Sequence, residues 1–346
     1  MKLPDIFRFD TLKIKLPFGV LLIYCIVLFP VVLFILEILL RYTNLQANLP
    51  PSTLDQKINY PEMDVKYQEF EFQNKVNNFD CIFLGTSMVD YGISPSEINT
   101  FQLQTNIKRP NCFNFALEAV MPETSSIIAK AFINKYGIKT IILGISAIDF
   151  AGKPYLTRKI NNIPWLNYIT GYPSFEGQII DQSIVYRYFI ALGKYRDTNY
   201  QNETHNLNLL INNYGQQIRQ NENSVYRVSP NRSVELPDYS LYQPDISGLK
   251  EFGEFQKQGI KIIVFEIPVH PNFLPYYVPQ GEKGYEELFI RPIESILADE
   301  NIPFIRSQPD VADIVSQNGW LDYSHLNEKG ATEFSRWLAL KIDSIQ

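Results

Sequence analysis

Histidine is scarce in this chain of 346 residues, which contains only three. His205, His270 and His325 are scattered and show no i, i+4 pairing, so their spacing predicts no metal site. Few histidines are therefore available as a general base near neutral pH.

Cysteine is equally scarce, at positions 25, 81 and 112. An odd count at these spacings matches neither a disulfide framework nor a zinc motif. Cys25 lies in an apolar N-terminal run, and Cys81 and Cys112 lie in expected core strands. We therefore expect three free thiols that pack as small hydrophobic side chains.

The sequence also lacks the features that are typical of nucleic-acid-binding and nucleotide-binding proteins. The chain has no basic stripe, and its net charge of −6 argues against nucleic acid as the main partner. No glycine-rich phosphate loop occurs, so no nucleotide cofactor is implied. What is present, 45% hydrophobic and 20% charged residues, is typical of a globular protein of one large or two small domains.

Charge is absent from residues 16–36, and the apolar run continues past Glu37 to Leu40. About 20 apolar residues suffice to cross a bilayer as a helix. A cleaved signal peptide is the alternative, but its apolar core is shorter and ends at a small-residue cleavage site. The segment 41–44 offers no such site, so we expect an uncleaved transmembrane helix over residues 16–40.

Positive charge is asymmetric about this run. Four basic residues precede it at positions 2, 8, 13 and 15, whereas Arg41 is the only early one after it. This asymmetry predicts a cytoplasmic tail over residues 1–15 and an extracytoplasmic remainder. Residues 41–78 are polar and contain Pro50-Pro51, so we expect a linker or stalk there.

Strand and helix patterns alternate from residue 79 to the C-terminus. Expected strands cover 81–85, 112–117, 140–144, 261–267 and 303–306, and the expected helices begin near Pro95, Pro122, Gly248, Tyr285 and after Asn327. Near-continuous apolar strands separated by helices predict a parallel sheet in a three-layer α/β/α sandwich. Residues 151–245 break the rhythm; we expect a partly helical cap over the active edge or, alternatively, a surface insertion without a catalytic role.

Polar side chains follow the expected strands at their carboxyl ends, where parallel sheets bind ligands. Ser87 follows the first strand, Ser146 and Asp149 follow the third, and Glu266 and His270 end the fourth. Both Glu266 and His270 are candidates for the substrate site. Glu266 otherwise has a buried partner or is a strand end that reaches solvent, and His270 is otherwise a structural turn residue between two prolines.

Ser87 and the segment 322–325 together contain the parts of a nucleophilic site. The first follows a strand and a tight turn at Gly85, and the second contains Asp322 and His325 just before the last helix. A serine hydroxyl requires a base to accept its proton, and that base requires an acid to orient it. Either segment alone is a weak signal, but both occur at opposite ends of one α/β unit.

These segments resemble the SGNH, or GDSL-type, hydrolase superfamily. Gly85-Thr86-Ser87-Met88 is similar to its first block and residues 322–327 to its last, over residues 78–346 without 151–245. The resemblance implies that Ser87 is the nucleophile, His325 the base and Asp322 its orienting acid.

The middle blocks depart from the family pattern. Ala119 stands where the family has a glycine that offers its amide to the oxyanion, and Ser146 stands in place of an asparagine donor. The resemblance implies an oxyanion site made by the amides of Ser87 and Ala119 together with Ser146. Loss of one oxyanion donor costs about 10²–10³ in rate.

The anchor and the divergent blocks resemble a branch of membrane-tethered proteins that add or remove O-acyl groups on cell-surface polymers. We therefore expect a serine esterase or O-acyltransferase that acts on acylated glycans or similar polymers without a cofactor. The alternatives are a non-catalytic binding or assembly protein on the same fold, and an enzyme that depends on a membrane acyl-donor protein.

Overall fold

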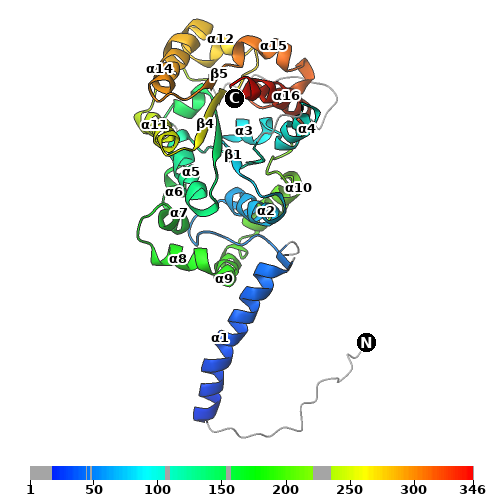
Figure 1. Cartoon of the computed structure of the whole chain (residues 1–346), viewed down its shortest axis with the longest axis vertical. Helices are drawn as coiled ribbons and strands as arrows, with labels where there is room; N and C mark the ends of the chain where they lie inside the picture. The colour runs from blue at the N-terminus through cyan, green and yellow to red at the C-terminus, as the bar shows by residue number, and fades with distance from the viewer. Residues whose placement is uncertain are drawn as a thin grey trace.

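A computed structural model describes residues 18–43, 45–46, 49–105, 110–152, 157–220 and 235–345. The predicted cytoplasmic tail and its four basic residues lie outside these ranges. The described chain forms one parallel sheet flanked by helices, with a long N-terminal helix projecting from one end (Figure 1).

The sheet contains five parallel strands in the order β2-β1-β3-β4-β5. They are β1 (Cys81–Leu84), β2 (Cys112–Asn114), β3 (Thr140–Ile145), β4 (Lys261–Glu266) and β5 (Phe304–Ile305). The first three are buried along their whole length, which explains their lack of polar alternation. The predicted parallel sheet is confirmed; β3 is one residue longer than predicted, and the other four strands are shorter.

Helices cover both faces of the sheet, which confirms the three-layer α/β/α architecture (Figure 1). One layer contains α5 (Pro122–Tyr136) and α11 (Gln243–Lys257), and the other contains α3 (Ser87–Gly92), α4 (Pro95–Thr105) and α16 (Glu328–Ile345). Prolines at the first positions of α4 and α5 start these helices as predicted. Gly137, at φ +67°, ends α5 in the left-handed conformation that favours glycine.

Further short elements lie in the connections that follow β3, β4 and β5. They are the 3₁₀ turns Ala147–Phe150, Gln308–Asp310 and Gln317–Gly319, the π-helical turn Tyr285–Ile290, and the helices α12 (Leu274–Tyr277), α13 (Gly281–Gly284), α14 (Arg291–Asp299) and α15 (Val311–Ile314). The predicted helix over 285–298 is thus a π turn followed by α14. Pro292 lacks an amide proton at this junction and cannot continue the regular ladder.

The order of the sheet reverses between β1 and β3, because the chain leaves β1 toward β2 on one side and later returns to β3 on the other. At such a reversal the loops after the two central strands diverge and leave a crevice at the carboxyl edge. Ser87 follows β1 and Ser146 follows β3, so both lie at this point of the fold.

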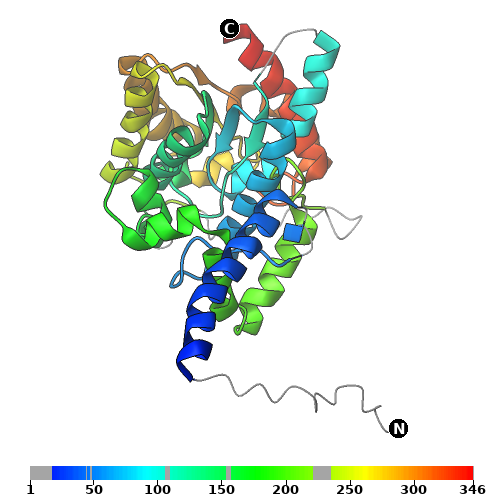
Figure 2. The same ribbon diagram turned by 60° about the horizontal axis from the view of Figure 1, so that its bottom comes forward.

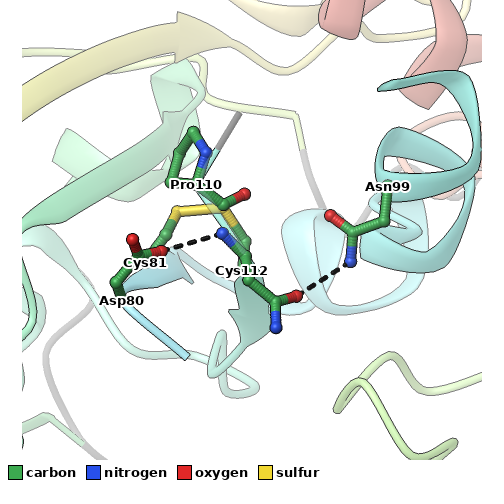
Figure 3. The surroundings of a disulfide bond; sticks show 6 residues. Asp80, Cys81, Asn99, Pro110 and Cys112 are labelled. Atoms are coloured by element: carbon green, nitrogen blue, oxygen red, sulfur yellow. Dashed lines mark hydrogen bonds between the residues drawn. A yellow bond between two sulfur atoms is a disulfide. The ribbon is translucent and has the colours of Figure 1, made fainter. Parts of the chain in front are cut away.

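Two of the cysteines form a disulfide, which corrects our expectation of three free thiols. Cys81 and Cys112 are register partners at the starts of β1 and β2, and their sulfur atoms are bonded (Figure 3). The Asn111 amide donates to Asp80 Oδ1 (2.8 Å) beside the bond. Spacing along the chain could not reveal this pair, because strand pairing brings the two cysteines together. Cys25 is free and exposed.

The predicted linker over residues 41–78 is also corrected. Its second half forms α2 (Pro61–Asn77), whose Met63, Tyr67 and Phe70 belong to the hydrophobic core. Phe70 lies edge-on to Phe113 of β2 at 5.3 Å between ring centres. The many charged residues of α2 hid this role, because several of them are buried in ion pairs rather than solvated.

The N-terminal helix α1 (Phe18–Tyr42) projects away from the domain (Figure 1). It is long and apolar enough to cross a membrane, since a window of 18 residues within Leu22–Tyr42 has a mean hydropathy of 2.8. Most of its side chains from Leu22 to Leu36 are exposed, as expected of a helix that faces lipid rather than a protein core.

The segment 151–245 is largely helical where it is described. It contains α6 (Thr157–Ile160), α7 (Pro164–Ile169), α8 (Phe175–Gln182), α9 (Ile184–Lys194) and α10 (Thr198–Leu210). Of these helices, α7 packs on α5, α9 on α1, and α10 on α2. The stretch 211–220 reaches the Ser87 helix, because the Gln217 amide donates to Asp90 Oδ1 (3.2 Å), and the Tyr242 amide donates to the Phe150 carbonyl after β3 (2.9 Å).

Candidate active site

Ser87 is presented by a tight turn at the end of β1. Gly85 has φ +145°, and a Cβ there would lie 2.3 Å from Cγ2 of Val89 and 2.8 Å from the Gly144 carbonyl oxygen. The turn therefore requires glycine at this position. From Cys81 to Pro95, Ser87 alone is not buried, so the turn brings one hydroxyl to the surface.

The short helix α3, which begins at Ser87, is held at its far end by Asn114 of β2. The buried Asn114 amide donates to the carbonyl oxygens of Val89 (3.0 Å), Asp90 (3.3 Å) and Ile93 (3.0 Å). The Val89 carbonyl also accepts from the Ile93 amide (3.0 Å), so Asn114 adds to the hydrogen bonds that close the end of this helix. Asn114 thus fixes the position of the helix that carries Ser87.

Asp322 and His325 lie in a loop that is closed on itself. Trp320 and Leu326 form an antiparallel bridge, and the Leu321 amide donates to the His325 carbonyl (2.8 Å). Asn327 accepts from the Gly330 amide (3.1 Å) as the predicted N-cap of α16. We call residues 320–327 the acid–base loop.

The acid–base loop meets the Ser87 turn, although 238 residues separate Ser87 from His325. Ser87 Oγ lies 2.9 Å from His325 Nε2, and His325 Nδ1 lies 2.9 Å from Asp322 Oδ2. The side chains of His325 and Asp322 are 21% and 31% exposed, so the three groups are accessible from one side. These distances match those of a nucleophile, its base and an orienting acid.

Asp322 is held as a carboxylate. Partial burial acts to raise its pKa, but hydrogen bonds from the His325 ring and from the amides of Ser324 and His325 outweigh burial, so the pKa of Asp322 lies below its ordinary value. An ionised carboxylate only accepts hydrogen bonds. His325 Nδ1 therefore donates to Asp322, and Nε2 is left to accept from the Ser87 hydroxyl.

Ala119 lies in a turn tied to the Ser87 turn. The Leu117 amide donates to the Gly85 carbonyl (3.1 Å), and the Val120 amide donates back to Leu117 (3.3 Å). Ala119 has φ +55°, the left-handed conformation that glycine adopts without strain. The backbone conformation expected of a glycine is thus kept, although the residue is alanine.

Ser146 does not occupy the position predicted for an oxyanion donor. It is fully buried, and both its amide (2.7 Å) and its hydroxyl (3.1 Å) donate to Asp149 Oδ2. This reciprocal cap starts the 3₁₀ turn Ala147–Phe150. Burial raises the pKa of Asp149 to about 7. The Ser146 hydroxyl is committed to Asp149, which a sequence comparison could not reveal.

Glu266 is also removed from the substrate site. It is fully buried and accepts from Tyr285 Oη (2.9 Å), Arg306 Nε (3.2 Å) and the amides of Ser307 (2.8 Å) and Gln308 (2.9 Å). Such complete pairing is what a buried carboxylate requires. The alternative of a buried partner is therefore confirmed, and Glu266 joins the end of β4 to the chain after β5.

His270 supports the acid–base loop from outside. Its amide donates to the Tyr323 carbonyl (2.8 Å), and its ring lies 5.2 Å from that of Trp320. His270 lines a cavity of about 560 Å³ together with Trp320 and Tyr323. Partial burial lowers the pKa of His270. In contrast, His205 is exposed on α10.

Tyr91, which lies beside His325, and the two residues that contact Tyr91 were not expected from the sequence. The Tyr91 ring lies 5.2 Å from the His325 ring, and its hydroxyl donates to Glu118. Arg219, from the stretch 211–220, stacks over Tyr91 at 4.9 Å and lies 3.7 Å from Glu118. Tyr91 follows Ser87 by one helical turn, and this spacing is the one sequence feature that could have placed Tyr91 near the site. The partners come from segments distant in the sequence.

A buried charge cluster lies behind the Ser87 helix. Lys66 of α2 is fully buried and pairs with Asp90 of α3, and its ammonium also donates to the Ala116 carbonyl. Glu62 accepts from the Glu118 amide (2.8 Å), next to Ala119. Burial, together with the nearby Asp90, raises the pKa of Glu62 well above its ordinary value. The helix α2 therefore fixes both the Ser87 helix and the Ala119 turn.

Within the part of the chain that the structure describes, no group of three or more His, Cys, Asp or Glu side chains could hold a metal ion. No protein-family model matches the chain, and no curated protein matches it. Among solved structures it is similar to the psychrotrophic esterase EstA from Pseudoalteromonas sp., inhibited by monoethylphosphonate. The match covers 77% of this chain and 100% of that chain at 11% identity and a TM-score of 0.38. A likeness this distant transfers no residue role.

Proposed function

We propose that this protein is a membrane-anchored, extracytoplasmic serine esterase or O-acyltransferase of the SGNH type. The observation that carries the proposal is the continuous hydrogen-bonded series from Ser87 Oγ through His325 to Asp322. It lies at the carboxyl edge of a parallel sheet, where such folds bind their ligands.

In the first half of the reaction, Ser87 Oγ attacks the carbonyl carbon of an ester while His325 Nε2 accepts the hydroxyl proton. Asp322 stabilises the imidazolium that forms. The tetrahedral intermediate then breaks its bond to the leaving alcohol, which takes the proton back from His325. The product is an acyl group bonded to Ser87.

In the second half, His325 accepts a proton from water or from a sugar hydroxyl, whose oxygen attacks the acyl carbon. The bond to Ser87 Oγ breaks, and His325 returns the proton to that oxygen. Water as acceptor gives an esterase, and a sugar hydroxyl gives a transferase. The same three side chains perform both reactions.

The oxyanion is proposed to accept from the amides of Ser87 and Ala119. The Ser87 amide is the first of α3 and has no acceptor within the helix. Because the Ser146 hydroxyl donates to Asp149, Ser146 is not counted among the proposed oxyanion donors. We therefore expect slower turnover than with a complete set, by about 10²–10³.

Two features support the location. The helix α1 suits a single membrane span, and the Cys81–Cys112 disulfide is typical of an oxidising compartment. A cavity of about 560 Å³ lined by Trp320, Tyr323 and His270 adjoins the acid–base loop, although Ser87, Asp322 and His325 do not line it. We propose O-acylated glycans or related cell-surface polymers as substrates.

The test uses the full chain in detergent, with p-nitrophenyl acetate and a fluorophosphonate probe. The native protein should release acetate and be labelled, and Ser87→Ala should lose both. Ser247→Ala, an exposed serine of α11, is the matched control and should retain both. Equal turnover in the native protein and Ser87→Ala would exclude Ser87 as the nucleophile.

The second candidate is a non-catalytic binding or assembly protein, favoured by the commitment of Ser146 to Asp149. A folded native protein that is neither labelled nor active would support this candidate. Activity that appears only on co-expression with a membrane acyl-donor protein would instead indicate an enzyme that works as part of a complex.

A further inference from the structure

The helix α9 has two apolar faces, although a helix on the surface of a soluble domain needs only one. Its inner face buries Ile184, Ile190 and Ala191 against the domain. Its outer face presents Phe189 and Leu192, which are 68% and 66% exposed. With the half-buried Val185 these residues follow the i, i+4, i+7 spacing of a continuous stripe, which we call the outer stripe.

The N-terminus of α9 is joined directly to the candidate membrane helix. Glu37 of α1 accepts from the amides of Ile184 (2.9 Å) and Val185 (3.1 Å) and from the Ser183 hydroxyl (2.9 Å). Arg41 bonds to Glu37 and to the Gln182 carbonyl in the same place. The first turn of α9 is therefore held at a defined level along α1.

That level is the edge of the apolar region of α1. Glu37 precedes the end of α1 at Tyr42 by five residues, or about 7–8 Å along the helix axis. Ile38 and Leu39, beyond Glu37, are apolar and exposed. If α1 spans a membrane, α9 begins at the depth of about 5–10 Å at which interfacial helices lie.

The neighbouring helix α8 adds to the same surface. Phe175, at the start of α8, is 79% exposed, whereas Tyr172 lines a cavity between α5 and α11 and does not belong to this surface. The helices α8 and α9 lie at the end of the domain where α1 joins it, and both views show α9 beside α1 (Figure 1 and Figure 2). Exposed aromatic side chains at this level are typical of a membrane interface.

We propose that the outer stripe of α9, with Phe175 of α8, is a second membrane contact that rests in the lipid interface beside α1. This inference rests on the membrane anchor in the proposed function but not on the catalytic assignment. The contact would hold the domain at a fixed tilt on the bilayer instead of leaving it to swing on one helix.

The contact is apolar rather than electrostatic. The two basic side chains within α9 are engaged by the domain, because Arg187 pairs with Glu71 (2.7 Å) and Lys194 with Asp64 (3.1 Å). Attraction to anionic lipid therefore does not drive the contact. We expect it to form on neutral phosphatidylcholine and to persist at high salt.

The test places the full chain in phosphatidylcholine nanodiscs whose lipids carry a nitroxide near the headgroup. A Cys25→Ser background removes the free thiol, and Phe189→Cys then carries an environment-sensitive fluorophore. Leu340→Cys is the matched control, since Leu340 is an exposed apolar residue on α16, away from α1 (Figure 1). The label at 189 should lose more than about half its emission in the presence of the nitroxide lipid and shift to the blue. The label at 340 should do neither.

The result at position 189 should be the same in 0.5 M salt. The proposal is overturned if the label at 189 is quenched no more than the label at 340. It is also overturned if the label at 189 shifts to the blue without quenching by the nitroxide lipid, because a partner protein rather than lipid then covers it. Extraction of the native chain by an alkaline wash would overturn it in another way, by showing that α1 does not span the membrane. Fluorophosphonate labelling of Ser87 reports the catalytic proposal separately.

Discussion

The two halves of the candidate active site differ in how they are built. The acid–base loop is closed by its own backbone, and Asp322 and His325 lie three residues apart in it. The oxyanion half is assembled from distant parts, with Ala119 held through Glu62 of α2 and Ser146 bound to Asp149. The acid–base loop can be recognised in the sequence because its residues form one short motif. The oxyanion half is formed by residues from several segments, so a single changed contact can remove one of its hydrogen-bond donors.

The largest expected effect comes from breaking the acid–base half. Asp322→Asn should lower kcat by about 10⁴-fold, because an amide can stabilise the wrong tautomer of His325. The native fold should persist, since Asp322 is 31% exposed. Esterase kinetics and thermal unfolding measure the two effects, with Asp313→Asn on α15 as the control for an exposed aspartate. A loss below tenfold would contradict the role of Asp322.

The next prediction concerns the oxyanion half. Ser146→Ala should change kcat/KM by less than about tenfold, whereas removal of a true oxyanion donor costs about 10²–10³. It should lower the free energy of unfolding by about 1–3 kcal/mol, because Asp149 loses a buried hydrogen bond. Kinetics and denaturant unfolding separate the two outcomes. A hundredfold loss of kcat/KM without a loss of stability would show that Ser146 is an oxyanion donor.

Asp149 makes the same half sensitive to pH. Its pKa is raised from 3.8 to about 7 by burial, so the unfolded chain releases this proton at lower pH than the folded chain does. The protonated Asp149 side chain makes its whole contribution to the free energy of unfolding below about pH 4, and this contribution decreases as the pH rises to about 7. Thermal unfolding of wild type and Asp149→Asn across this interval should show the steeper decrease in wild type. Parallel curves would show that Asp149 does not titrate there.

The smallest effect is expected at Ala119. Ala119→Gly should raise the free energy of unfolding by up to about 1 kcal/mol, because glycine adopts φ +55° without the steric cost of a Cβ. The amide stays in place, so kcat should change less than about threefold. Ala129→Gly, within α5, is the control and should destabilise. A large kinetic effect of Ala119→Gly would show that the methyl group itself shapes the site.

Much of the fold followed from the sequence because the local signals were strong. The buried strands near 81–84 and 140–145, the helix starting at Pro122 and the N-cap at Asn327 were all predicted close to their observed positions. The Gly85 turn and the acid–base loop were predicted for the same reason. What failed was pairing between distant segments: the Cys81–Cys112 disulfide and the docking of α2. Neither the disulfide nor the packing of α2 produces a local pattern in the sequence.

The order of apolar strands and helices determined the parallel sheet, because strands buried on both faces and linked by helices have few other arrangements. The sequence by itself also determined which side chains could act as nucleophile, base and acid, since His325 is one of three histidines. Only the tertiary structure decided that Ser87 Oγ lies 2.9 Å from His325 and that Ser146 serves Asp149 instead of a ligand. The physical reason is that the direction of a hydrogen bond depends on atoms brought together by packing, and the residue type limits only which bonds can form.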